Sequence, residues 1–293
     1  MQERAEVLEC EGNQLVSILH EPQEIGDTGV VIIVAGGPQY RVGAHRQFVL
    51  LARQLAASGI PVVRFDHRGT GDSEGDYRGF LDMNTDIRCA VDFLYRSYPH
   101  LKNTALWGEC ESASAAAYYA YTDDRIGGIF MVNPWVRTEV GLAKTYLKHH
   151  YRARLMDPEF WQKVRSGNFS ISNSLGSVVE LFKQVIASKF TSGISGNETA
   201  IEDLPLTQRL EECLLRFHRE IFVLTSGRDH IAQEYKDFVD SSKTLGEHLS
   251  GDQVELYEIE DSDHTFSRSE WREELFEKTE IWLGRLSNPE PGT

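Results

Sequence analysis

The chain has few cysteines and no long apolar run, and each absence excludes a class of protein. Its four cysteines, Cys10, Cys89, Cys110 and Cys213, lack both the paired spacing of a zinc site and the density of a disulfide-stapled domain. The longest strongly apolar stretch, residues 30–35, is too short to span a bilayer, so no membrane insertion is expected. The first residues lack the basic-then-apolar pattern of a secretory signal. A reducing, cytoplasmic location is therefore expected.

Positive charge is also scarce. Lys and Arg number 30 against 45 Asp and Glu, which gives a formal net charge of -15. Diffuse attraction to nucleic acid or to anionic lipid is therefore not expected. No glycine-rich phosphate loop or metal-ligand cluster stands out, so neither a cofactor nor a metal is predicted. These exclusions leave a small molecule or a protein as the expected partner, and they say nothing about oligomeric state.

Strand patterns and helical patterns alternate along much of the chain. This alternation predicts an α/β fold with a mostly parallel, doubly wound sheet of about eight strands. Strands are predicted at 6–10, 14–21, 29–35, 61–65, 104–108, 126–132, 220–225 and 254–260, and helices at 45–58, 86–98, 112–121, 233–249 and 270–286.

The alternation of strand and helix patterns stops between residues 134 and 217. There the sequence is helical and polar, with two Gly/Ser/Asn-rich stretches. We interpret 134–217 as a helical cap inserted into a core formed by 1–133 and 218–287. Residues 288–293 are expected to form a frayed tail.

The segment around Cys110 joins a predicted strand directly to an alanine-rich helix. Gly108-Glu-Cys-Glu-Ser112 resembles the G-x-S-x-G nucleophile elbow, in which residues two before and two after the nucleophile must be small. Cys110 occupies the centre of that pattern and is the predicted nucleophile; Ser112 and Ser114 are the alternatives. The amino end of the helix favours a thiolate there, whereas the flanking glutamates disfavour it. The other interpretation is that Cys110 is a small buried core residue.

On folds with such an elbow, the acid and then the histidine follow the nucleophile along the chain. Asp229 follows the strand predicted at 220–225, and His264 follows the one predicted at 254–260. His264 is therefore the predicted base and Asp229 the acid that orients it. His230 and His67 are the rival bases, and Asp261 and Asp263 are alternative partners for the imidazole.

A tetrahedral intermediate needs two N–H donors. The backbone N–H of Glu111 and that of Gly37 are the predicted pair, because Pro38 has no N–H; Gln39 is the alternative second donor. Gln39, Trp135 and Tyr146 are predicted to contact the substrate.

Further motifs carry a resemblance to known proteins. Asp66-His-Arg-Gly-Thr-Gly-Asp-Ser73 resembles the D-x-R-G-x-G-x-S loop of α/β-hydrolases, a motif that implies loop organisation rather than chemistry. The stretch 36–48, the cysteine elbow and Asn133-Pro-Trp-Val-Arg-Thr138 are similar to the exosortase A system-associated hydrolases (type 1). That resemblance implies a bacterial hydrolase linked to exopolysaccharide and protein sorting. The Glu-Ser pair at 111–112 departs from that group.

The nucleophile suggests the substrate, because an acyl-cysteine is a thioester. An ester or thioester, such as an acyl-CoA or acyl-carrier thioester, is the expected substrate. Hydrolysis is the first expectation, acyl transfer with the same triad the second, and a catalytically silent binding or scaffold protein the third. A basic stretch at 144–154, carrying Lys144, Lys148, His149, His150, Arg152 and Arg154, either holds a substrate anion or is a solvated helix face. The solvated face is favoured.

Overall fold

The computed structural model describes residues 1–34, 40–136 and 200–287. Its centre is one eight-stranded sheet with the strand order β1-β2-β4-β3-β5-β6-β7-β8. β1 pairs with β2 and β2 with β4 in antiparallel fashion, while all other neighbouring strands pair in parallel. This arrangement confirms the predicted mostly parallel sheet. The strands are β1 (Gln2–Cys10), β2 (Asn13–Glu21), β3 (Thr28–Ile33), β4 (Val62–Phe65), β5 (Asn103–Glu109), β6 (Ile126–Val132), β7 (Glu220–Ser226) and β8 (Val254–Ile259).

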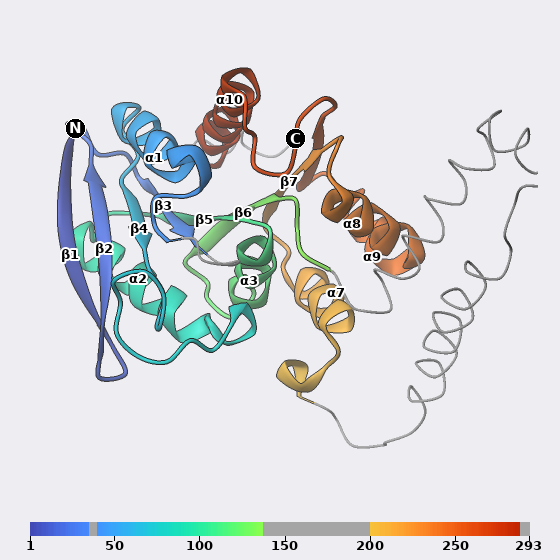
Figure 1. Cartoon of the computed structure of the whole chain (residues 1–293), viewed down its shortest axis with the longest axis horizontal. Helices are drawn as coiled ribbons and strands as arrows, with labels where there is room; N and C mark the ends of the chain where they lie inside the picture. Colours follow the sequence, from blue (N-terminus) through green and yellow to red (C-terminus); the bar gives the residue numbers. More distant parts are fainter. Residues whose placement is uncertain (35–39, 137–199, 288–293) are drawn as a thin grey trace, which may run out of the picture.

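Helices cover both faces of the sheet (Figure 1). One face packs against α1 (Gln47–Ala57) and α10 (Ser269–Ser287). On this side the rings of Trp107, Phe130 and Phe222 stack across β5, β6 and β7. The opposite face packs against α2 (Asn84–Ser97), α3 (Glu111–Ala120), α7 (Leu206–Arg216), α8 (His230–Ser241) and α9 (Lys243–His248). Short 3-10 helices lie at Ala44–Arg46, Phe80–Asp82 and Ile201–Asp203.

Burial along the strands follows the sequence patterns that predicted them. Every residue of the β-branched run in β3 is buried, as expected of a strand covered on both faces. β1 lies at one edge of the sheet and is mostly exposed. Only Leu8 and Cys10 are buried in it, with the exposed Glu9 between them, as expected where one face of a strand packs on the core.

One predicted helix is wrong in its extent. Residues 233–249 were expected to form a single helix, but the chain forms α8 and then α9, separated at Ser242. Ser242 is extended (φ -118°, ψ 111°), and its hydroxyl oxygen accepts a hydrogen bond from the N–H of Leu245 at 3.2 Å. Serine is a strong N-cap residue, so the side chain ends one helix and starts the next.

Most of the predicted cap, residues 137–199, lies outside the described residues, and so does the predicted tail, 288–293. Within the predicted cap range, α7 packs against α3. The guanidinium of Arg209 on α7 lies 4.3 Å from the ring centroid of Tyr118 on α3. The division into core and cap stays a prediction. No helix of the described ranges has the length and apolar character needed to cross a membrane.

Candidate active site

The turn between β5 and α3 holds Cys110 in a strained conformation. Its φ of 61° and ψ of -124° lie outside the regions that side-chain-bearing residues normally occupy. Cys110 N–H donates to the carbonyl of Val132 at 2.8 Å, and the Cys110 carbonyl accepts from the N–H of Trp135 at 3.2 Å. Strain of this kind is characteristic of functional turns and persists only when neighbouring contacts enforce it. Cys110 is partly exposed here, not a buried core residue.

The small residues on either side of Cys110 have distinct roles. A Cβ on Gly108 would lie 2.5 Å from the carbonyl carbon of Ser112, so no other residue fits. Ser112 instead uses its side chain: its hydroxyl accepts from the N–H of Glu109 and donates to the carbonyl of Glu109, both at 2.8 Å. The hydroxyl therefore closes the turn across the nucleophile position, which explains serine in place of the usual second glycine.

The two alternative nucleophiles are committed to the main chain. Ser112 is fully buried with both hydrogen bonds made to Glu109. The hydroxyl of Ser114 is also buried and donates to the carbonyl of Trp135 at 2.7 Å. Neither oxygen is placed to attack a substrate, which leaves Cys110 as the candidate at this turn.

His264 and Asp229 come together from the loops after β8 and β7. The Nδ1 atom of His264 lies 2.6 Å from Oδ2 of Asp229. Asp229 is also the N-cap of α8, and its carboxylate accepts from the N–H groups of Ile231 at 3.1 Å and Ala232 at 3.3 Å. A carboxylate held by three donors has a fixed orientation and so fixes the imidazole beside it.

The electrostatics of this pair are strongly perturbed. Burial lowers the pKa of His264, but hydrogen bonds and charge interactions with Asp229 and Cys110 outweigh it and raise the pKa to about 10. Burial alone would raise the pKa of Asp229, yet the hydrogen bond and positive charge of His264 and the two helix N–H groups lower it. An imidazole with this proton affinity can hold a proton taken from the Cys110 thiol, which itself contributes to the raised pKa of His264.

The rival acids and bases have other partners. Asp261 pairs with Arg228, and Asp263 accepts from the N–H of Ser267 at 3.0 Å. His230 is exposed at the first residue of α8, and Nδ1 of His67 lies 3.2 Å from the carbonyl oxygen of Arg68. Among the described residues, the carboxylate beside His264 is therefore that of Asp229.

Asn133, which follows β6, links these loops in a way that sequence reasoning missed. Its amide oxygen accepts from Ser226 N–H at 2.8 Å, and its amide nitrogen donates to the Ser226 hydroxyl at 2.9 Å. The same nitrogen also donates to the carbonyl of His264 at 3.3 Å. Asn133 is fully buried with a φ of 45°, a conformation that asparagine tolerates better than most residues. Its place in the Asn-Pro-Trp motif was the available signal.

We expect Asn133→Ala to lower both stability and activity. The substitution leaves the buried N–H of Ser226 without its acceptor and frees the His264 loop, so we expect a loss of about 2–3 kcal/mol in unfolding free energy. The accompanying shift of the imidazole should lower kcat about ten- to a hundredfold. Urea unfolding and steady-state ester turnover measure the two effects. Asn13→Ala in the β1–β2 hairpin is the control and should leave kcat unchanged.

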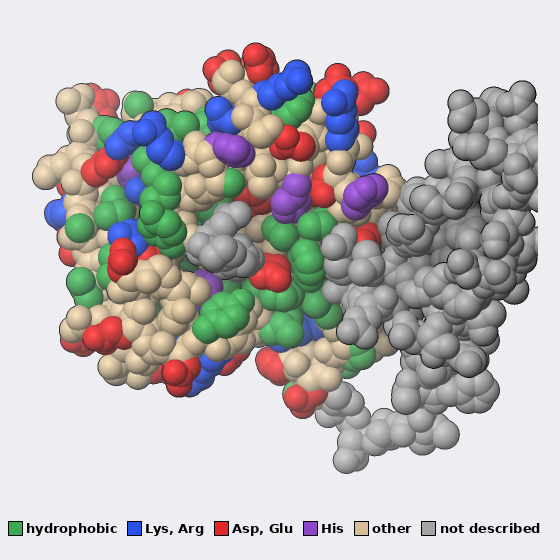
Figure 2. Space-filling view, viewed as in Figure 1, with side chains coloured by type: hydrophobic (Ala, Val, Ile, Leu, Met, Phe, Trp, Pro, Cys, Tyr) green, Lys and Arg blue, Asp and Glu red, His purple; other side chains and the backbone are tan. Residues whose placement is uncertain are grey.

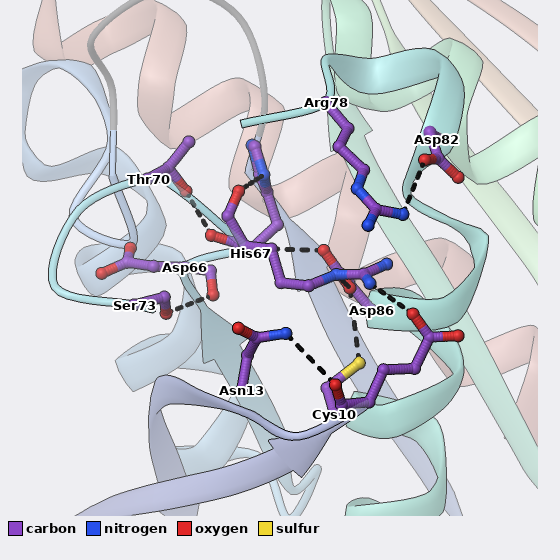
Figure 3. A network of polar contacts seen from close by, with 11 residues as sticks. Cys10, Asn13, Asp66, His67, Thr70, Ser73, Arg78, Asp82 and Asp86 are labelled. Atoms are coloured by element: carbon purple, nitrogen blue, oxygen red, sulfur yellow. Dashed lines mark hydrogen bonds and ion pairs between the residues drawn. The ribbon is translucent and has the colours of Figure 1, made fainter. Parts of the chain in front are cut away.

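The Asp66–Ser73 motif organises the neighbouring loop, as its resemblance implies. The Nε atom of Arg68 donates to Oδ1 of Asp86 at 2.6 Å. The hydroxyl of Ser73 donates to the carbonyl of Asp66 at 2.6 Å (Figure 3). Asp66 also accepts from the N–H of Arg41 at 2.6 Å and pairs with its guanidinium. Asp66 thereby anchors the chain that follows β3, close in sequence to the predicted oxyanion donor.

The remaining predicted site residues divide into two groups. Glu111 is the first residue of α3, where backbone N–H groups have no partner within the helix, and Trp135 contacts Cys110 through its main chain. Gly37, Gln39 and Tyr146 lie outside the described residues.

In Figure 2, hydrophobic side chains gather beside histidine and acidic side chains near the middle of the visible face. The described ranges contain no group of three or more His, Cys, Asp or Glu side chains that could hold a metal ion.

The charged pair makes stability depend on pH. Because the folded pKa of His264 lies above its ordinary value, its contribution is complete below about pH 6.5 and is lost as the pH rises towards about 10. Asp229, whose folded pKa is lowered, loses its contribution only in acid, as the pH falls below about 4. We expect the unfolding free energy of wild type to exceed that of His264→Gln by about 1–3 kcal/mol at pH 6, and this difference should shrink by pH 10. Unfolding in urea across this range measures it, and a difference that grows with pH would contradict the assignment.

The chain is similar to known proteins both in sequence and in fold. Residues 28–268 match the sequence model of the family described as "Serine aminopeptidase, S33". An esterase from Pyrococcus furiosus is similar at 18% identity and a TM-score of 0.63, over 97% of this chain and 91% of that one. Est1E from Butyrivibrio proteoclasticus, solved with ferulic acid, is similar at 14% identity and a TM-score of 0.61, over 96% of this chain and 99% of that one.

A serine hydrolase without a lid from Xanthomonas campestris is similar at 15% identity and a TM-score of 0.58, over 100% of this chain and 97% of that one. No curated protein sequence matches the chain. At these identities the structural likeness concerns the fold alone, and it confirms the predicted α/β-hydrolase fold.

Proposed function

Because the chain belongs to the serine aminopeptidase (S33) family of α/β-hydrolases, we propose that it hydrolyses ester or thioester bonds with Cys110 as nucleophile. The observation that carries the proposal is the strained Cys110 on the β5–α3 turn, close enough to influence the pKa of a His264 that is itself held by Asp229. Two of the structural relatives are described as an esterase and as a protein binding ferulic acid, which favours an ester substrate.

The reaction proceeds in two halves. Cys110 Sγ attacks the carbonyl carbon while its proton passes to His264, and Asp229 stabilises the imidazolium that forms. The N–H of Glu111, with that of Gly37, stabilises the tetrahedral oxyanion. His264 then protonates the departing alcohol or thiol, leaving an acyl-cysteine. Water, deprotonated by His264, attacks this thioester and releases the carboxylic acid and the free thiol.

Cysteine in a family named for serine affects the choice of substrate. The acyl-cysteine is itself a thioester, so its formation from an ester or another thioester costs little free energy. Its formation from a stable amide costs much more. Transfer of the acyl group to an acceptor other than water would use the same residues and is the second proposal. The link to exosortase-associated systems stays a prediction from the motifs in residues 36–48 and 133–138.

Short p-nitrophenyl esters and acyl-CoAs test the proposal directly. We expect turnover, with a mass increase equal to the acyl group on the peptide that carries Cys110. Cys110→Ala should lose both the adduct and the turnover. An adduct on another residue, or turnover that persists in Cys110→Ala, would contradict the assignment. Slow iodoacetamide labelling of Cys110, no faster than that of Cys89, would favour a silent binding protein instead.

A further inference from the structure

Glu109, the last residue of β5, precedes the nucleophile and is only 5% exposed. Among the described residues, the one hydrogen-bond partner of its carboxyl group is Gln47, the fully buried first residue of α1. The Gln47 amide nitrogen donates to Glu109 Oε2. No described residue hydrogen bonds to Oε1 of Glu109 or to Oε1 of Gln47. Two buried oxygens without donors are costly, and the pair therefore calls for an explanation.

The protonation state of Glu109 supplies one. An ionised carboxylate only accepts hydrogen bonds, so Oε1 of Glu109 and Oε1 of Gln47 would both lack a donor. A neutral carboxyl group accepts the amide N–H at one oxygen and carries an O–H at the other. A carboxylic acid and a primary amide can then pair reciprocally, with the O–H donating to the amide oxygen. One proton on Oε1 of Glu109 would thus remove a buried charge and supply the O–H that this reciprocal pairing with the Gln47 amide requires.

The surrounding charges act in both directions. Burial raises the pKa of Glu109 to about 7, opposed by the positive charge of His264 and by the Gln47 hydrogen bond. The negative charges of Asp229 and Asp263 raise the pKa further. Two carboxylates and one imidazole therefore act on Glu109, and Cys110 is its neighbour in the chain.

We propose that Glu109 is a positioning residue that rests as a neutral acid paired with the Gln47 amide, so that no carboxylate charge opposes a thiolate on Cys110. This inference rests on the proposed role of Cys110. The proton exchanges with solvent and needs no other reactant. When Glu109 loses it in mild alkali, a negative charge appears one residue from the sulfur and disfavours the thiolate.

Infrared spectroscopy tests the resting state without any substrate. At pH 6 we expect the carbonyl band of a protonated, buried carboxyl group in wild type, absent from Glu109→Gln and fading in wild type towards pH 9. Glu111→Gln, which alters the carboxyl on the other side of Cys110, should keep the band. No band at pH 6, or a band lost in Glu111→Gln and kept in Glu109→Gln, would overturn the proposal. If Glu109→Gln does not fold, Gln47→Leu replaces it and should shift the band by removing the amide.

The effect on Cys110 is measured by its rate of alkylation with iodoacetamide. The ratio of the Glu109→Gln rate to the wild-type rate should be close to one at pH 6. It should rise about three- to tenfold by pH 8.5, since only wild type gains the charge. A ratio that does not change with pH would overturn the claimed influence on the sulfur. Both measurements are independent of turnover, so a failure to find a substrate leaves them decisive.

Discussion

Replacing His264 by alanine is expected to lower kcat/KM for ester hydrolysis by about 10³- to 10⁴-fold. The imidazole accepts the thiol proton in the first half of the reaction and activates water in the second, so both halves lose their base. Asp229 keeps its hydrogen bonds to the α8 N–H groups in this variant, so the fold around the site should persist. Steady-state hydrolysis and the iodoacetamide labelling rate of Cys110 should both fall.

His230→Ala is the matched control for this experiment. His230 is another histidine close to Asp229, but it is exposed and lies at the start of α8. Its removal should change kcat/KM by less than about threefold, in line with the small effects of exposed substitutions. A large loss of kcat/KM in His230→Ala, with little effect of His264→Ala, would show that His264 is not the base.

Gly108→Ala is expected to cost about 2–3 kcal/mol of unfolding free energy and most of the activity. The added Cβ would lie 2.5 Å from the carbonyl carbon of Ser112 and 2.7 Å from the nitrogen of Ala113. These are backbone atoms of the first turn of α3, so the clash is relieved only by moving the helix away from β5. That movement would open the turn that holds Cys110. Chemical unfolding and acyl-adduct formation measure the two losses.

The control for Gly108→Ala is the same change at Gly284. This glycine lies within α10, and a Cβ there would meet no heavy atom within 4 Å. Since alanine is the better helix former, Gly284→Ala should raise the unfolding free energy by about 0.5–1 kcal/mol without affecting turnover. Equal destabilisation by both substitutions would show that the close approach at Gly108 is not the cause.

Much of the fold follows from local patterns. The buried β-branched run of β3 and the helical spacing in α1 and α2 were readable because burial imposes their periodicity directly. The break between α8 and α9 was missed, although Ser242 carries the signal. Its apolar neighbours continue a helical pattern, and only the extended backbone shows that the serine caps a new helix.

The candidate site was predictable where chain order determines it and not where contacts between distant residues determine it. Cys110, Asp229 and His264 each follow a recognisable strand, so their loops could be assigned from the sequence. The sequence indicates only that Ser112 is a small residue. The structure shows that its hydroxyl hydrogen bonds to both the N–H and the carbonyl of Glu109. The pairing of Glu109 with Gln47 joins residues 62 positions apart, and no local pattern encodes it.

The edge position of β1 has a consequence for how this protein behaves at high concentration. Its outer side has no strand partner among the described residues, so its backbone could pair with another copy. The strand carries four charged side chains, at Glu3, Arg4, Glu6 and Glu9, which project from its two faces beside that open edge. An approaching identical strand would have to bring these ionic groups together and strip their water before any ladder forms. Crowded solutions should therefore remain dispersed, and neutral substitutions along this strand would promote fibre-like association while leaving catalysis intact.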